Sequence, residues 1–225
     1  MPQNSEANIT SLFLNATPNI LHGDRKPIFD PTARAWRRIV ESAQGGAPIF
    51  VADAARWLQK DSGRPVRTPV PIVGYSALKQ SETILAKEVG AAFAKLEVAT
   101  LCGGLDGLVI LGARGTKEAG GFALGLLSDT DWRNMPPYLT HVLAAGPGSG
   151  RSTMIADAGL GLVAIGGSEG TLAEMAHALR FKRRMLAFSG TSDTAGAQRF
   201  ASVKDIVETI VGIVLNICST ETPWR

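Results

Sequence analysis

An arginine and a glutamate, Arg151 and Glu174, each follow a glycine-rich turn of this sequence within a few residues. A guanidinium group can hold a phosphate or a carboxylate through two parallel hydrogen bonds. A carboxylate beside such a turn can bind sugar hydroxyls or orient a water molecule. The pair therefore indicates a site for an anionic ligand.

The turn before Glu174 belongs to a stretch, residues 160–174, that has the pattern of a strand, a loop and a helix start. An apolar run ends at Ile165, and a helical pattern begins at Thr171. Glycine lets backbone N–H groups approach a phosphate closely, and the unpaired N–H groups and the dipole of a helix start hold its charge. The residues of this loop that we predict to bind phosphate are Gly166, Gly167, Ser168, Gly170 and Thr171.

Further glycine turns follow predicted strands in the same way, at Gly74, at residues 103–104 and at residues 146–150. Because the carboxyl ends of parallel strands meet at one edge of a sheet, we expect these turns to converge on one ligand site. They add Gly74, Ser76, Gly103, Gly104, Gly148 and Gly150 to the predicted phosphate-binding residues. The turn at 146–150 is a near miss to a P-loop, because Ala145 replaces its first glycine and Arg151 replaces its lysine. An NTPase is excluded because the strand that should supply a magnesium-binding Asp ends in Gly166 and Gly167, and the helix after Arg151 is too short.

The elements that must position these residues alternate between strand and helix from Val70 onward. This alternation predicts an α/β fold with a doubly wound parallel sheet, Rossmann-like in arrangement, over residues 70–225. The predicted strands are 70–73, 98–101, 122–127, 141–145, 160–165 and 185–188, and the predicted helices are 81–96, 108–119, 151–158, 171–181 and 203–217.

Residues 1–69 differ in pattern from the rest of the chain, because frequent prolines divide them into short segments. They predict a small N-terminal α+β extension of unknown role, with strands at 11–15 and 27–29 on either side of a turn at residues 22–24. Asp30 and Pro31 are typical of a helix start, and the spacing of Trp36 with the apolar residues after it predicts a helix that ends at Gly45 and Gly46. A second helix is predicted over 52–59. Three arginines of the first helix, Arg34, Arg37 and Arg38, are expected on its outer face. That face is either simply solvated, which we favour, or a basic docking surface.

Several residues near the predicted site also have plain structural interpretations. Thr171 and Glu174 have the spacing of a capping box, in which each side chain binds the other's backbone N–H group. Asp106 is typical of a turn, and His177, one helical turn after Glu174, is typical of a helix surface. The cations at 182–184 suit a helix C-terminus. No spacing of His, Cys and Asp indicates a metal site.

Composition narrows the function classes. The net charge is only +3 and the cations are dispersed, so nucleic-acid binding is not indicated. Cys102 ends an apolar run and Cys218 is distant in sequence, which favours a disulfide-free protein. No leader pattern opens the sequence, and no stretch reaches the roughly 20 apolar residues of a membrane span. We expect a cytoplasmic protein without a membrane partner.

The glycine motifs together resemble a known superfamily. Residues 166–174 are similar to the Pro-Gly-Gly-x-Gly-Thr-x-x-Glu signature of the LONELY GUY phosphoribohydrolases, formerly labelled lysine decarboxylases, and of their relatives, the molybdenum cofactor carrier proteins, within the SLOG superfamily. Residues 103–108 and 113–121 resemble the first glycine motif and its helix, and residues 150–155 resemble the arginine-bearing helix start. The resemblance covers about residues 70–190.

In the hydrolase branch, the resemblance implies that Arg151 and Glu174 cleave the N-glycosidic bond of a nucleoside 5'-monophosphate. Three departures from the signature favour the carrier branch instead: Gly166 replaces its proline, Ser168 replaces its second glycine, and Ser152 replaces the lysine after the arginine. The preferred hypothesis is therefore a carrier that binds the molybdenum cofactor or a nucleotide without turnover. The resemblance also implies a homodimer or homotetramer.

Overall fold

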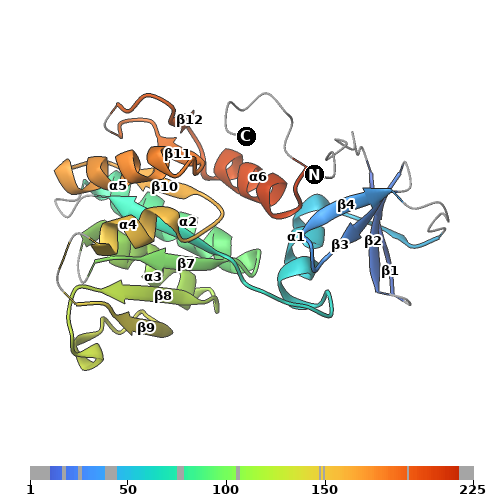
Figure 1. The fold of residues 1–225 in the computed structure, drawn as a ribbon, viewed down its shortest axis with the longest axis horizontal. Helices are drawn as coiled ribbons and strands as arrows, with labels where there is room; N and C mark the ends of the chain where they lie inside the picture. Colours follow the sequence, from blue (N-terminus) through green and yellow to red (C-terminus); the bar gives the residue numbers. More distant parts are fainter. Residues whose placement is uncertain are drawn as a thin grey trace. The chain divides into compact units, whose positions relative to one another are not determined.

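The computed structural model describes residues 11–16, 19–24, 27–38, 45–74, 79–104, 107–146, 148, 150–191 and 193–217. These residues form two compact units (Figure 1). Unit 1 holds the described residues up to 67 together with those from 208 on, and unit 2 holds the described residues of Thr68–Val207. The domain boundary after residue 69 stays a prediction.

Unit 2 contains a seven-stranded sheet, and every pair of neighbouring strands in it is parallel. The strand order is β12-β11-β10-β6-β7-β8-β9, so the direction of winding reverses between β6 and β10. The predicted doubly wound α/β fold is confirmed. The strands are β6 (Pro69–Gly74), β7 (Ala99–Cys102), β8 (Ala123–Leu127), β9 (His141–Ala144), β10 (Leu162–Ile165), β11 (Met185–Phe188) and β12 (Gln198–Phe200).

Helices cover both faces of this sheet (Figure 1). The chain moves across the sheet in one direction through α2 and α3 and in the other through α4 and α5. Right-handed crossovers therefore place the two pairs on opposite faces. All residues of β7, β10 and β11 are buried, as strands covered on both sides must be. These helices are α2 (Gln80–Lys95), α3 (Gly107–Glu118), α4 (Gly150–Asp157) and α5 (Glu169–Arg180). A short 3-10 helix, η1 (Trp132–Asn134), follows β8, and α6 (Val203–Val214) follows β12, with its residues from 208 on in unit 1.

Glycines allow α2 and α3 to pack with their backbones in contact. A Cβ atom on Gly90 would lie 2.0 Å from the carbonyl oxygen of Gly112, and one on Gly115 would lie 2.1 Å from the carbonyl oxygen of Lys87. The buried hydroxyl of Thr116 donates towards the carbonyl oxygens of Gly90 (3.1 Å) and Gly112 (3.0 Å). This helix pair fixes the start of α3, which stands at the edge of the candidate site.

The substitution Gly90→Val is expected to destabilise the protein by about 1–3 kcal/mol or more, because the new side chain meets rigid backbone and the helices must separate. The midpoint of urea denaturation measures this loss. Ser81→Val is the control, because it places the same side chain on an exposed position of α2. Equal midpoints for the two variants would contradict the tight packing.

Unit 1 contains a five-stranded sheet with the order β4-β3-β2-β1-β5, and its paired strands are antiparallel. The indole N–H of Trp36 donates to the carbonyl oxygen of Leu215 (2.7 Å), just after α6 ends. The last residues of α6 thus belong with the N-terminal sheet. The elements are β1 (Leu12–Asn15), β2 (Ile20–Gly23), β3 (Pro27–Asp30), β4 (Ala35–Arg38), β5 (Ala47–Ile49) and α1 (Val51–Lys60).

The helix predicted from Asp30 onward is wrong, because β3 and β4 form a hairpin there. The carboxylate of Asp30 accepts the backbone N–H groups of Thr32 (2.8 Å) and Ala33 (3.0 Å), as it would at a helix start. The same bonds also close a tight turn. Arg34 has a φ of +52°, which is the left-handed region, so a right-handed helix cannot continue through it. Trp36 and Arg37 therefore lie in a strand. Residues 39–44 lie outside the described part of the chain.

Two smaller expectations for the extension also need correction. The turn predicted at residues 22–24 is wrong in part, since His22 and Gly23 belong to β2. His22 is buried, stacks on Phe13 and bonds through Nε2 with the carbonyl oxygen of Gly45 (2.8 Å). The helix predicted over 52–59 is confirmed as α1, and β5 and β12 were not predicted.

Candidate functional site

A cavity of about 360 Å³ opens at the carboxyl ends of β6, β7 and β10. This is the point where the strand order of the sheet reverses, which is where open α/β sheets bind ligands. Its walls come from three of the four predicted glycine loops and from the first turns of α3, α4 and α5. The lining residues are Gly74, Gly103, Gly104, Val109, Arg151, Ser152, Ser168, Glu169, Gly170, Thr171 and Glu174.

Some predicted site residues are not among those that line this cavity. Gly148 precedes α4 and Gly150 is its first residue, and a Cβ atom on either would meet nothing within 4 Å. Gly166 and Gly167 lie in the loop between β10 and α5 but do not line the cavity wall. Ser76 lies outside the described residues, as does Asp106.

Gly166 has a backbone conformation that its counterpart in the signature cannot adopt. Its φ is +66°, whereas the proline ring holds φ near −65°. A Cβ atom on Gly166 would also lie 3.2 Å from a carboxylate oxygen of Glu82. A proline could not replace Gly166 here, so the backbone enters this loop in a conformation that the signature proline does not allow.

Two helix N-termini face the cavity, because the first turns of α4 and α5 both line it. Ser168 is the N-cap residue of α5, and its side chain makes no capping bond among the described residues. Each helix start carries unpaired N–H groups and about half a positive charge. The backbone alone thus makes this cavity attractive to an anion.

Arg151 supplies the positive side chain. Its Nε and Nη1 atoms are buried and have no hydrogen-bond partner among the described residues. Its Nη1 atom lies 3.7 Å from the position that a Cβ atom of Gly103 would take, so the guanidinium reaches across to the loop after β7. Buried guanidinium donors without acceptors are costly. An anionic ligand would supply those acceptors.

Thr171 and Glu174 do not form the predicted capping box, and that prediction is wrong. Helix α5 begins at Glu169, and Leu172 donates its N–H to the carbonyl oxygen of Ser168 (2.9 Å), so Thr171 is already inside the helix. The hydroxyl of Thr171 is buried without a hydrogen-bond partner among the described residues. The helix starts two residues earlier than predicted, and both side chains line the cavity.

The carboxyl group of Glu174 is largely buried between α4 and α5. Burial raises the pKa of Glu174 to about 7, although the charge of Arg151 and a hydrogen bond with Ser152 both act to lower it. The group therefore sits close to half-protonated at neutral pH. A carboxyl group in this state can donate or accept a proton at the cavity wall.

Three lining residues were not among the predicted site residues: Val109, Ser152 and Glu169. Ser152 and Glu169 stand inside the glycine motifs of the sequence, next to the predicted site residues Arg151 and Ser168, and this position was the signal that could have found them. Val109 is the third residue of α3 and is an ordinary apolar residue. No sequence pattern distinguishes it.

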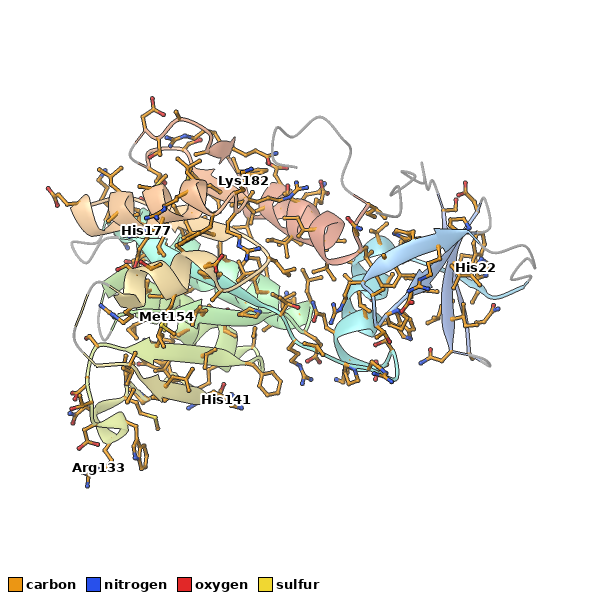
Figure 2. All side chains as sticks on the ribbon, viewed as in Figure 1. His22, Arg133, His141, Met154, His177 and Lys182 are labelled. Atoms are coloured by element: carbon orange, nitrogen blue, oxygen red, sulfur yellow. The ribbon has the colours of Figure 1, made fainter. Side chains whose placement is uncertain are left out.

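The neighbouring polar residues have structural roles. His177 lies on α5 (Figure 2). Its Nε2 atom is 3.5 Å from the hydroxyl of Thr153, and its ring stacks on Phe181. Arg183 bonds to Asp157 of α4 (2.8 Å). These contacts hold α4 beside α5.

The remaining sequence expectations concern the cysteines, a metal site and a membrane span. Burial raises the pKa of the Cys102 thiol to about 12, which makes it an inert core residue, and Cys218 lies outside the described residues. Among the residues with described positions, no three His, Cys, Asp or Glu side chains form a group suited to a metal ion. Within the same residues, no helix has the length and apolar character to span a membrane.

The seven-stranded parallel sheet with helices on both faces defines a Rossmann-like α/β protein. The chain belongs to the SLOG cluster4 family, whose family model matches residues 67–211. This confirms the superfamily suggested by the glycine motifs. None of the curated proteins compared with the chain matches it.

Solved structures share this fold. The molybdenum cofactor binding protein from the phototrophic bacterium Rippkaea orientalis is 20% identical, with a TM-score of 0.62 over 66% of this chain and 98% of that one. The Moco carrier protein from Chlamydomonas reinhardtii is 24% identical, with a TM-score of 0.60 over 67% of this chain and 99% of that one. DNA processing protein A from Streptococcus pneumoniae is 17% identical, with a TM-score of 0.53 over 63% and 61%. At these identities the likeness shows the fold.

Proposed function

We propose that this protein binds a phosphate-bearing ligand in the cavity around Arg151 and carries it without turnover. One observation carries the proposal: Arg151 Nε, Arg151 Nη1 and Thr171 Oγ1 are buried polar atoms of cavity-lining residues, and none has a partner among the described residues. Phosphate oxygens are acceptors that satisfy all three, and bonds between a guanidinium and a phosphate are among the strong ones.

The ligand class that we favour is the molybdenum cofactor or a nucleotide. The two molybdenum cofactor binding and carrier proteins described above share the fold, which supports the first. The residues present fit the phosphate group that both ligands carry, since glycine backbone, two helix starts and Arg151 surround one cavity. The chain would hold such a ligand by its phosphate end.

The test is to identify what the protein binds. We expect a pterin or a mononucleotide to co-purify, or the purified protein to bind AMP or the oxidised pterin of the cofactor saturably. Mass spectrometry of the denatured protein and equilibrium titration measure the two outcomes. A protein that carries no such compound and binds neither probe would overturn the proposal.

A second function, nucleoside 5'-monophosphate phosphoribohydrolase, is favoured by one observation. Arg151 and Glu174 line the same cavity, and the pKa of Glu174 near 7 is suited to proton transfer at neutral pH. The protein would then release free base from AMP, and Glu174→Gln would abolish the release while Arg151 still held the phosphate. If the wild type releases no base from AMP and related monophosphates, the carrier proposal stands alone.

Two partner predictions accompany this function. The resemblance to the LONELY GUY and carrier proteins suggests a homodimer or homotetramer, which light scattering of the purified protein tests. The chain is not proposed to bind nucleic acid, because its cations are dispersed along the sequence. DNA processing protein A shares the fold, so a titration with single-stranded DNA tests this prediction. We expect no saturable binding.

A further inference from the structure

The cavity that would hold a phosphate is lined by carboxyl groups as well as by a cation. Its charged lining residues are Arg151 from α4 and Glu169 and Glu174 from α5. Glu169 is exposed at the start of α5, whereas Glu174 is largely buried. His177, one turn further along α5, bonds with Thr153 and is not a lining residue. One cation therefore faces two carboxyl groups.

This balance does not suit a doubly charged ligand when both acids are ionised. The three side chains then sum to one negative charge, which the two helix starts offset by about one unit, so the cavity has no net positive charge left for a dianion. A phosphate dianion would meet the buried Glu174 carboxylate where water screens poorly, so the repulsion would be large. A ligand that engages Arg151 also takes away the cation that helps Glu174 to ionise. Both effects favour the neutral form of Glu174 in the complex.

We propose that Glu174 takes up a proton when the cavity binds a phosphate group, so that the affinity for the ligand rises as the pH falls through neutrality. This inference rests on the proposed function and names its regulation. The raised pKa of Glu174 supports it, because the free protein already holds this proton part of the time at neutral pH. A carrier built in this way releases its ligand when the proton is lost.

Sulfate and AMP are the probes. Sulfate keeps its double charge across the pH range of the experiment, so any proton taken up on sulfate binding comes to the protein. For the wild type we expect the affinity for sulfate to fall about tenfold per pH unit above pH 7, as the linkage of one proton requires. Calorimetry at pH 8 in buffers of different ionisation enthalpy should count about one proton per anion bound.

Two variants assign the proton. Glu174→Gln should bind sulfate with an affinity that changes little between pH 6 and pH 9, whereas Glu169→Gln, on the cavity rim, should keep the wild-type slope. If Glu174→Gln does not fold, the carbonyl stretch of a protonated carboxyl group in the infrared spectrum of the wild type, appearing when the anion is added at pH 8, gives the same answer.

The outcomes separate this inference from the proposed function. If neither sulfate nor AMP binds at any pH, the proposed function fails for nucleotides and the inference fails with it. If AMP binds and sulfate does not, the AMP series above pH 8, where its phosphate is fully ionised, replaces the sulfate series. Binding without proton uptake, or with the same uptake in Glu174→Gln, overturns the inference and leaves the proposed function intact.

Discussion

The substitution Arg151→Ala is expected to weaken the binding of AMP by about 100-fold or more while leaving the protein at least as stable as the wild type. The guanidinium offers two buried donors to the ligand, and hydrogen bonds between charged groups contribute about 1.5–3 kcal/mol each. Two such bonds correspond to about 3 kcal/mol or more, which is at least about two powers of ten in affinity. Equilibrium titration with AMP measures the loss.

Stability should respond in the opposite way. In the free protein the Nε and Nη1 atoms of Arg151 are buried without a partner among the described residues. Removing these unsatisfied donors relieves a desolvation cost, and at pH 6, where Glu174 is mostly neutral, little attraction between Arg151 and Glu174 is lost. Urea denaturation at pH 6 without ligand should therefore give an equal or higher midpoint for Arg151→Ala. Arg133→Ala is the matched control, because Arg133 is exposed on η1 and pairs with Asp131. Unchanged AMP affinity in Arg151→Ala would place the ligand elsewhere.

The substitution Glu174→Gln should stabilise the protein at pH 8 and leave it unchanged near pH 4.5. The pKa of Glu174 rises from its ordinary value of 4.5 to about 7 in the folded state, so the folded state binds the proton more tightly than the unfolded state. That stabilisation is complete below pH 4.5 and is lost as the pH rises to about 7. A shift of this size corresponds to about 3 kcal/mol of wild-type stability lost over the interval.

Glutamine does not titrate, so Glu174→Gln escapes this loss. Urea denaturation at pH 4.5, 6 and 8 should show the variant and the wild type diverging as the pH rises, with the variant more stable by up to about 3 kcal/mol at pH 8. Glu169→Gln should follow the wild type, because Glu169 is exposed. Parallel curves for wild type and Glu174→Gln would mean that Glu174 ionises as an ordinary glutamate.

The fold of unit 2 could be predicted because its pattern is strong. Strands buried on both faces, such as β10 and β11, are short apolar runs, and the helices between them have a clear helical period. The edge strand β12 could not be predicted, since only Phe200 of its three residues is buried. An edge strand of that length leaves no alternation to recognise.

The candidate site could be predicted by residue type but not by register. Arg151 and Glu174, both predicted from residue type and spacing, line one cavity. The first residue of α5 was not predictable, because a glycine loop and a helix start have overlapping patterns. The capping-box pairing of Thr171 with Glu174 was wrong for that reason. The hairpin at Asp30 was missed for a similar reason. A carboxylate that accepts two backbone N–H groups is found both at helix starts and in tight turns, so the residue type does not distinguish them.

The bond between Trp36 and Leu215, 179 positions apart, has a consequence for the order in which the protein folds. Thr68–Val207 are continuous in sequence, so unit 2 can fold while the ribosome is still adding residues 208–217. Unit 1 lacks part of its own structure until residues 208–217 have been made. The N-terminal sheet, synthesised first, would then be completed last, which reverses the usual order of cotranslational folding.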